Sequence, residues 1–193
     1  MSHPARLDVI AGPMFAGKTR EFIGRIHAML EQGHMVRVVK PRIDNRYALY
    51  EVVSHDGMRF PAQVVDLDAS PFPTDCDVIA IDEAQFLSTK GVEKVLAALD
   101  SGISILVAGL DLDCWGRPFA AMTAYGAVAK NVKTLKGRCA VCGKPSTRSF
   151  RLIESTETVL VGGPEAYEPR CLDCFEEGHR RHRERPEDHV SLD

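Results

Sequence analysis

The sequence predicts an α/β protein in which helices cover both faces of a parallel β-sheet. Over the first 137 of the 193 residues, short apolar segments that suit buried strands alternate with segments of helical periodicity. A glycine-bounded loop follows the first apolar segment, and both C-x-x-C pairs lie beyond residue 137. Strands that alternate with helices are typical of parallel sheets. We therefore expect one sheet domain followed by a small second domain.

The first elements follow from the spacing of apolar residues. Residues 7–11 form a short apolar run that predicts a buried strand, and residues 12–19 form a loop. Apolar residues then recur at spacings of three and four, which predicts a helix over 19–31 that ends before Gly33. These apolar residues are Phe22, Ile23, Ile26, Met29 and Leu30.

Three further core strands and one helix are expected. The strand segments are "MVRVVK" (35–40), "CDVIAID" (76–82) and "ISILVAGL" (103–110). Residues 88–102 begin with a capping serine, show helical spacing and end in glycine, which predicts a helix. Segments 41–50 and 54–60 are polar and turn-rich, so they predict loops around a short strand at Glu51–Val53.

The domain boundaries follow from the change in composition. The sheet domain is expected over 1–137 and a small domain over 138–178, with β-like runs at 149–153 and 158–161. Residues 176–193 are almost wholly polar and predict a frayed helix followed by disorder, with the disordered tail expected over 179–193.

The bulk composition is typical of a globular protein. Apolar residues make up 45% and charged residues 26%, and no apolar run approaches the ~18 residues that a membrane span needs. No apolar secretory core precedes the first glycine loop, so we expect a cytoplasmic protein without a membrane partner. A net charge of −3 argues against a nucleic-acid partner.

The segment "GPMFAGKT" matches the phosphate-binding pattern G-x-x-x-x-G-K-[ST] (P-loop). Gly12 and Gly17 let backbone N–H groups turn toward phosphate oxygens. Lys18 brings a positive charge to the β and γ phosphates, and Thr19 offers a hydroxyl to Mg²⁺. The motif follows an expected strand and precedes an expected helix, which is the context that a phosphate-binding loop requires. This arrangement predicts a P-loop, RecA-like fold that binds a nucleoside triphosphate.

Two adjacent carboxylates follow the apolar strand "VIAI". Asp82 is placed to hold Mg²⁺, as an acid at the end of a neighbouring core strand does in P-loop proteins. Glu83 is a candidate general base that accepts the proton of a hydroxyl group. In an ATPase the same residue would orient water.

Two loops are further candidates for binding. The loop after the strand at 103–110 could line a substrate cleft, because ligands bind at the carboxyl edge of open α/β sheets; its candidates are Asp111, Asp113, Trp115 and Phe119. The loop after the second strand offers Asp44, Arg46 and Tyr47, for which an ordinary surface role is an equal alternative.

Two C-x-x-C pairs predict a structural zinc site. Cys139, Cys142, Cys171 and Cys174 can complete a tetrahedral set of four thiolates. The 28 residues between the pairs exceed the usual ~15–20, so the metal would close a long loop. The histidines at 179, 182 and 189 are expected at the surface of the tail.

Taken together, the motifs resemble one family. The chain contains, in order, "GPMFAGKT", "KPRIDNRY", "SHDG", "DEAQF", "GLDLDCWGRPF", the cysteine pairs and "LVGGPEAYEPRC". This series is similar to the zinc-containing cytosolic thymidine kinases, the type II family, over residues 6–175. The resemblance implies a kinase domain over 1–137 and a zinc-binding domain over 138–178 whose loop wraps the nucleoside.

The resemblance also implies an activity and its partners. The activity is ATP-dependent phosphorylation of the thymidine 5′-hydroxyl, giving dTMP, with structural Zn²⁺ and with Mg²⁺ accompanying ATP. A homotetramer with feedback inhibition by dTTP is implied as well. The alternative reading is a P-loop ATPase with a zinc finger that acts on nucleic acid, although such motors usually need a second lobe and a basic track.

Site residues are implied position by position. The resemblance makes Glu83 the catalytic base, and it makes Asp82 and Thr19 the magnesium-linked residues. The implied ATP-binding residues are Gly12, Pro13, Met14, Phe15, Ala16, Gly17, Lys18, Thr19, Asp82, Glu83, Ala84 and Gln85. The implied substrate-binding residues are Phe86, Leu110, Phe119, Ser149, Val159, Leu160, Val161, Gly162, Gly163 and Tyr167.

The chain departs from the family pattern at two positions. Cys114 and Leu87 stand where the family usually has aromatic residues. If a ring at either position stacks on the base, its loss changes the selectivity for the nucleoside.

Overall fold

The computed structural model describes residues 4–42, 51–54, 57–66, 73–153 and 162–184, with the backbone alone for 182–184. Its largest element is a sheet of six strands in the order β5-β2-β6-β7-β1-β8, and all of its pairings are parallel. The strands are β1 (Leu7–Ala11), β2 (Val36–Pro41), β5 (Gln63–Val65), β6 (Val78–Ile81), β7 (Ser104–Gly109) and β8 (Asn131–Thr134). The predicted α/β class is confirmed.

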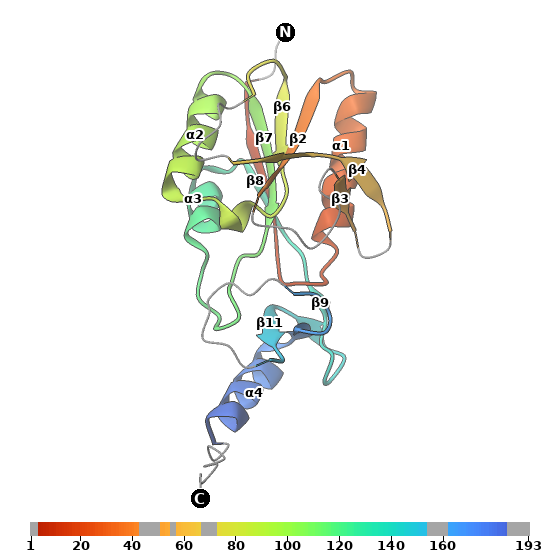
Figure 1. Ribbon diagram of the computed structural model, residues 1–193, viewed down its shortest axis with the longest axis vertical. Helices are drawn as coiled ribbons and strands as arrows, with labels where there is room; N and C mark the ends of the chain where they lie inside the picture. Colours follow the sequence, from red (N-terminus) through yellow and green to blue (C-terminus); the bar gives the residue numbers. More distant parts are fainter. Residues whose placement is uncertain (1–3, 43–50, 55–56, 67–72, 154–161, 185–193) are drawn as a thin grey trace, which may run out of the picture.

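Helices cover both faces of this sheet (Figure 1). One face carries α1 (Lys18–Glu31), and the other carries α2 (Thr89–Asp100) and α3 (Ala120–Val128). The two helices expected from the sequence are confirmed, and the Ser88 side chain accepts a hydrogen bond from the Gly91 N–H as the predicted N-cap of α2.

The strands contribute side chains to two separate hydrophobic cores, because successive side chains along a strand point to opposite faces of the sheet. On the α1 face, Phe22 and Ile26 of the helix pack against a set of buried strand residues. These are Ile10, Val38, Ala80, Leu106 and Ala108. On the opposite face, α2 and α3 pack against Leu7, Val9, Val39, Ile79, Ile81, Ile105 and Val107. The strands are buried on both sides, which is why they read as continuous apolar runs.

A β-hairpin of β3 (Glu51–Val53) and β4 (Arg59–Pro61) lies on the α1 side of the sheet. The strand expected at Glu51–Val53 is confirmed, but the loop expected over 54–60 is wrong at its end, where β4 begins. The turn is closed by the Ser54 hydroxyl, which accepts the Met58 N–H at 2.9 Å. Val52 and Phe60 join the core beneath α1.

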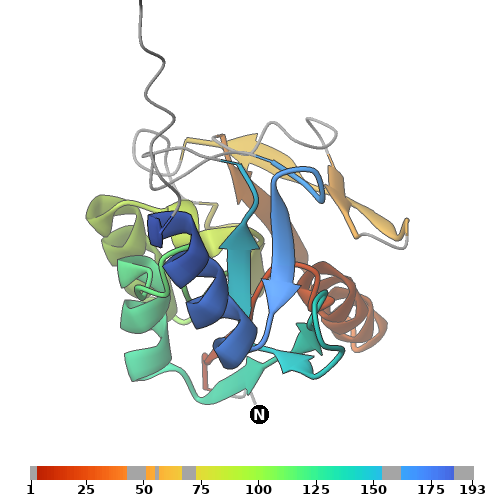
Figure 2. The ribbon, with the colours of Figure 1, turned by 90° about the horizontal axis from the view of Figure 1, so that it is seen from below.

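The C-terminal segment lies beyond the carboxyl ends of the parallel strands (Figure 2). It contains the pairs β9 (Gly137–Arg138) with β10 (Pro145–Ser146) and β11 (Arg148–Arg151) with β12 (Tyr167–Arg170), followed by α4 (Leu172–Glu184). The tail boundary expected at residue 179 falls inside α4, whose backbone continues to Glu184. The β-like run expected at 158–161 lies outside the described residues.

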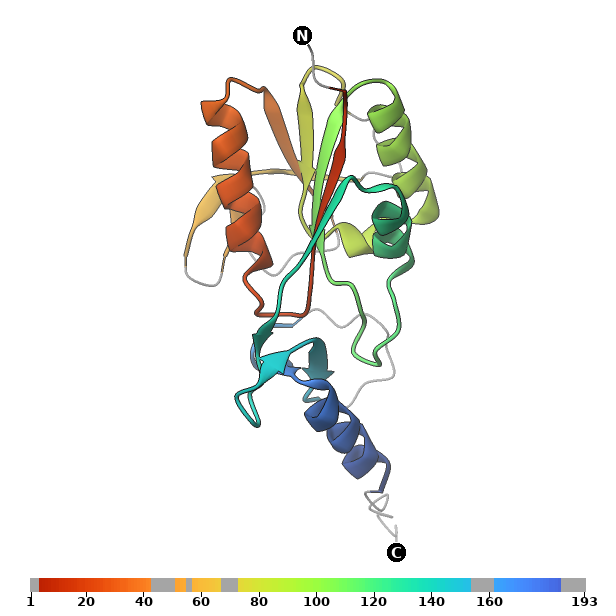
Figure 3. The ribbon, with the colours of Figure 1, turned by 180° about the vertical axis from the view of Figure 1, so that it is seen from behind.

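The elements not expected from the sequence are β4, β5, α3 and β8 in the sheet domain and the short strands β9, β10 and β12 beyond it. The helix α3 is rich in alanine and contains Gly126, so its apolar spacing is inconspicuous. The strand β8 leads from α3 to the C-terminal segment along the edge of the sheet (Figure 3), and all four of its residues are exposed. Within the described part of the chain, none of the helices has the length and apolar character of a membrane span.

Candidate active site and cysteine cluster

The P-loop runs from the end of β1 to the start of α1. Gly12 has φ +142°, and a Cβ atom there would lie 2.5 Å from the Leu135 carbonyl oxygen, so the position requires glycine. Gly17 has φ +82° and directly precedes α1, which begins at Lys18. The Lys18 ammonium donates a hydrogen bond to the Pro13 carbonyl at 2.8 Å. The N-terminus of α1 thus adjoins a loop of the conformation that binds phosphate.

The two carboxylates lie directly after β6. The Asp82 Oδ1 atom accepts the Glu83 N–H at 3.0 Å, and the Asp82 side chain is buried. Glu83 has φ +54°, an uncommon conformation for a residue other than glycine, and it caps a 3₁₀ turn, η1 (Ala84–Phe86). Strained backbone of this kind is often found at functional sites.

Gln85 connects the carboxylate of Glu83 to the next strand. Its Nε2 atom donates to Glu83 Oε2 at 2.5 Å, and its Oε1 atom accepts the Leu110 N–H at 3.0 Å. Gln85 is buried, and a Cβ atom on Gly109 would lie 2.6 Å from its Oε1. Gly109 therefore leaves the space that Gln85 occupies, and Gln85 sets the direction of the Glu83 side chain.

One cavity of about 270 Å³ brings most of these groups together. It is lined by Lys18 and Thr19 of α1 and by Asp82 and Glu83 after β6. Of the other expected nucleotide-binding residues, Met14, Phe15 and Gly17 also line it. The cavity thus places a phosphate-binding loop opposite two carboxylates.

The expected substrate-binding residues divide into four groups, of which the fourth, Ser149 and Tyr167, is buried beside the P-loop. Leu110, Gly162 and Gly163 line the cavity. The rings of Phe86 and Phe119 pack edge to face at 6.5 Å, and neither residue lines the cavity. Val159, Leu160 and Val161 lie outside the described residues, as do the loop residues Asp44, Arg46 and Tyr47.

Ser149 of β11 and Tyr167 of β12 are buried where the C-terminal segment contacts the P-loop. The Ser149 hydroxyl accepts the Met14 N–H at 2.9 Å, so β11 is bonded to the P-loop. Tyr167 packs with Cys114 and Ala166, and its hydroxyl accepts a hydrogen bond from Arg151 at 3.2 Å. Met14 and Phe15 pack against the same small cluster. The P-loop is therefore supported from the C-terminal side as well as by the sheet.

The loop over residues 110–119 is held by its own contacts. Asp113 is buried and accepts hydrogen bonds from the N–H groups of Trp115 and Arg117 and from the Arg117 side chain, at 2.8–2.9 Å. Of this loop, Leu110 alone is among the cavity residues, so the idea that Asp111, Asp113, Trp115 and Phe119 line the cavity is not supported. Cys114 is 5% exposed, and burial raises the pKa of its thiol.

His179 was expected at the surface of the tail, and that expectation is wrong. Its Nε2 atom lies 3.0 Å from the Cys114 carbonyl oxygen. Its ring lies 4.5–5.2 Å from the rings of Phe175, Phe150 and Trp115. The polar sequence around His179 hid this packing, which becomes visible only when α4 is placed beside the loop 110–119.

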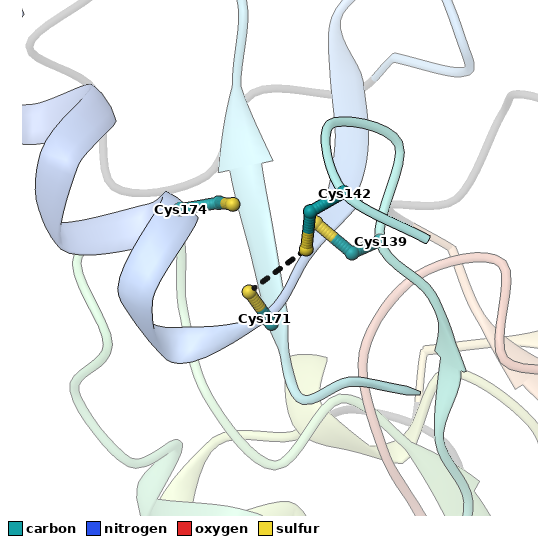
Figure 4. A group of neighbouring side chains, drawn as sticks. All are labelled: Cys139, Cys142, Cys171 and Cys174. Carbon is teal, nitrogen blue, oxygen red and sulfur yellow. Dashed lines mark hydrogen bonds between the residues drawn. The ribbon is translucent and has the colours of Figure 1, made fainter. Parts of the chain in front are cut away.

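The four cysteines of the two C-x-x-C pairs converge on one point (Figure 4). Their sulfur atoms all lie within 4.8 Å of one another, and those of Cys142 and Cys171 are 3.5 Å apart. Cys139 and Cys142 come from the turn between β9 and β10, where Gly143 has φ +74°. Cys171 and Cys174 lie at the start of α4. The group is compatible with a tetrahedral zinc site.

The environment of Cys139 favours the thiolate form that a metal requires. Burial alone would raise the pKa of this thiol, but backbone N–H groups of Cys171, Cys142 and Val141 lower the pKa to about 6. The Cys171 carbonyl accepts the Phe175 N–H at 3.0 Å, which fixes the first turn of α4. Hydrogen bonding to Cys171 and burial raise the pKa of Cys174 to about 12, so a bound cation would be needed to keep all four sulfurs as thiolates.

Comparisons with known proteins agree with this geometry. A family model described as "Thymidine kinase" matches residues 5–175. A thymidine kinase of Thermococcus kodakarensis is 41% identical over 184 residues, covering 88% of this chain and 93% of the relative. A thymidine kinase of Bacteroides fragilis is 36% identical over 182 residues, covering 93% and 92%.

A weaker structural likeness was also found. A solved structure titled as a DNA replication initiation factor has a TM-score of 0.39 and 12% identity, over 70% of this chain and 41% of that one. That likeness is too weak to bear on function. The family match over nearly the whole chain, together with the two curated relatives, shows that the chain belongs to the thymidine kinase family.

Proposed function

We propose that the cavity transfers the γ-phosphoryl group of ATP to the 5′-hydroxyl of thymidine, giving dTMP and ADP. The observation that carries this proposal is the position of Glu83, which lines the same cavity as Lys18 and Thr19 of the P-loop. Family membership supports thymidine as the acceptor. The P-loop supports a nucleoside triphosphate as the donor.

The proposed reaction uses Glu83 as the general base. As the thymidine O5′ atom forms a bond to the γ phosphorus, the bond from that phosphorus to the β,γ-bridging oxygen breaks and ADP leaves. The hydroxyl proton goes to the Glu83 carboxylate, whose direction is set by the 2.5 Å hydrogen bond from Gln85. Most of the catalytic effect in such a reaction comes from positioning and from charge stabilisation.

The P-loop and Asp82 are proposed to hold the donor. Backbone N–H groups of residues 12–19 and the Lys18 ammonium bind phosphate oxygens. Thr19 and Asp82 both line the cavity and offer the oxygen ligands that Mg²⁺ prefers, so they are the residues that would hold it. When bound with ATP, Mg²⁺ neutralises charge on the phosphates.

The C-terminal segment is proposed to hold the nucleoside. Gly162 and Gly163 line the cavity, and glycine lets the backbone approach a ligand closely. Ser149 and Tyr167 would support this region by packing against Met14 and Cys114, and Phe86 and Phe119 would form a more distant wall. We further propose that residues 1–137 and 138–178 act as the kinase and zinc-binding domains.

Acceptor dependence tests the activity. Purified protein is given ATP, Mg²⁺ and, in turn, thymidine, deoxyuridine, deoxycytidine and deoxyadenosine, and both nucleoside monophosphate and free phosphate are measured. The proposal predicts dTMP from thymidine and little phosphate release when no nucleoside is present. Release of phosphate at the same rate with and without any nucleoside would instead support a P-loop ATPase.

Three further properties are proposed on more general grounds. A homotetramer and inhibition by dTTP rest on the resemblance to type II thymidine kinases, and the exposed edge strand β8 offers a surface on which chains can associate. A cytoplasmic location is proposed because a site made of four thiolates persists best in a reducing compartment. Light scattering of the purified protein and a dTTP titration of its activity test the first two.

A further inference from the structure

Lys40, the fifth residue of β2, is a buried lysine outside both the P-loop and the acidic pair. It is 2% exposed, although lysine is almost never fully buried unless it is paired. It lines the same cavity as Lys18, Asp82 and Glu83. A buried charge in a cavity of ionisable groups is a candidate functional residue.

The alternation of β2 and β6 directs Lys40 toward the P-loop side of the sheet. Val38, two residues earlier, packs in the core beneath α1, and Ala80 does the same two residues before Asp82. Because side chains two apart in a strand share a face, Lys40 and Asp82 continue these rows on the α1 face. Val39 pairs with Ile81, so Lys40 and Asp82 follow at neighbouring positions of adjacent strands.

One contact of the Lys40 ammonium connects it to a wall of the cavity. Its Nζ atom donates a hydrogen bond to the Glu51 carbonyl oxygen at 3.1 Å. Glu51 begins β3, and Glu51, Val52 and Val53 line the cavity. The Glu51 carboxylate is paired with Arg59 of the same hairpin at 2.8 Å. This hydrogen bond holds the ammonium at the part of the cavity wall that β3 forms.

The charges around the cavity call for a second cation. Asp82 and Glu83 bring two carboxylates, and a triphosphate adds further negative charge. Lys18 supplies a positive charge from the P-loop side, and Arg20 is exposed at the rim. Lys40 lines the cavity from β2, next to Asp82 at the end of the neighbouring strand, where a cation can offset charge on the terminal phosphoryl group as it is transferred.

We propose that Lys40 is a second cationic contact of the transferring phosphoryl group, acting from β2 while Lys18 acts from α1. This inference rests on the proposed kinase function of the cavity and adds a catalytic residue to it. Because the contact is to the terminal phosphoryl group, Lys40 stabilises bound ATP more than bound ADP. It also stabilises the transition state, so its loss lowers kcat more than it raises the KM for thymidine.

The test compares Lys40→Met and Lys40→Gln, which remove the charge but keep most of the side-chain length, with Lys40→Arg, which keeps the charge. Calorimetric titrations with ATP and with ADP, both with Mg²⁺ and without thymidine, give the ratio of the two affinities. We expect the neutral variants to lose about tenfold in that ratio and about 10²-fold in kcat, the scale of one charged contact to a developing charge. Lys40→Arg is expected to retain most of the ratio.

Two controls separate the possible outcomes. Arg59→Met removes the exposed ion pair of the same hairpin and should leave both the ratio and kcat unchanged. Thermal melting identifies any variant that fails to fold, and the second neutral variant then carries the test. Equal loss of affinity for ATP and for ADP would leave the ratio unchanged, and it would overturn the proposal by showing that Lys40 only holds the hairpin. Unchanged affinities for both nucleotides would overturn it as well. Absence of thymidine phosphorylation by the unmodified protein would instead refute the kinase function, because the nucleotide titrations need no acceptor.

Discussion

The amide of Gln85 donates a hydrogen bond to the carboxylate of Glu83 across 2.5 Å. The same amide accepts the Leu110 N–H, so the direction of the Glu83 side chain is set from β7 and from the turn η1 at once. Glu83 itself has a left-handed backbone conformation, which turns its side chain away from the line of β6. The base proposed for the reaction is thus oriented by a neighbouring side chain.

Gln85→Met is expected to reduce kcat by about tenfold or more while the protein still folds. Methionine fills a similar volume but cannot donate to Glu83, and a hydrogen bond to a charged group contributes about 1.5–3 kcal/mol. Steady-state kinetics with thymidine and ATP measure the effect. The matched control is Gln63→Met, since Gln63 is exposed on β5 and does not line the cavity. Equal kcat values for the two variants would show that Gln85 does not orient the base.

The cysteine group is expected to bind about one Zn²⁺ per chain and to stabilise the C-terminal segment. Cys171→Ser should lose the metal and lower the free energy of unfolding by several kcal/mol, because metal binding and folding of such sites are coupled. Elemental analysis and thermal melting measure the two effects. Cys76→Ser is the control, since Cys76 lies outside the group. Purified protein with no zinc, or a Cys171→Ser variant that keeps it, would contradict the assignment.

Glu21 is expected to make the stability of the protein depend on pH in the acid range. Hydrogen bonds from Lys133 and Arg25, at 2.8 and 2.9 Å, lower the pKa of this carboxyl below its ordinary value of 4.5. The contribution is therefore fully present above about pH 4.5 and is lost as the pH falls through the lower pKa of the folded state.

Urea unfolding of Glu21→Gln measures this contribution. At pH 7 the variant should be less stable than the unmodified protein by about 0.5–1 kcal/mol, the range for partly exposed ion pairs. At pH 3 the difference should be smaller, since Glu21 is then becoming protonated in both states. A difference that grows on acidification would contradict the sign of the pKa shift.

The sequence predicted those parts of the fold whose signal is local. The strands at 7–11, 78–81 and 104–109 are apolar because both faces of the sheet are covered, and Ser88 is a cap by its own chemistry. The edge strand β8 carries exposed residues and has no such signal. The cysteine cluster could be predicted because C-x-x-C spacing reflects a local turn, even though 28 residues separate the two pairs.

Contacts between distant segments could not be predicted. The hydrogen bond between Met14 and Ser149, and that of His179 with the Cys114 carbonyl, join residues that are 135 and 65 positions apart. No pattern within either segment encodes its partner. Lys40 did carry a signal, namely a lysine near the end of an otherwise apolar core strand, but only the cavity shows which groups it faces.

The central claim is that Glu83 accepts the proton of the thymidine hydroxyl. The most direct test is the rate of dTMP formation by Glu83→Gln, with ATP binding and thermal melting measured on the same sample. We predict that the variant folds and binds ATP but loses a factor of 10² or more in kcat, the scale of general-base catalysis. Glu93→Gln, at an exposed position on α2, should retain full activity. An unchanged rate of thymidine phosphorylation by Glu83→Gln would contradict the account.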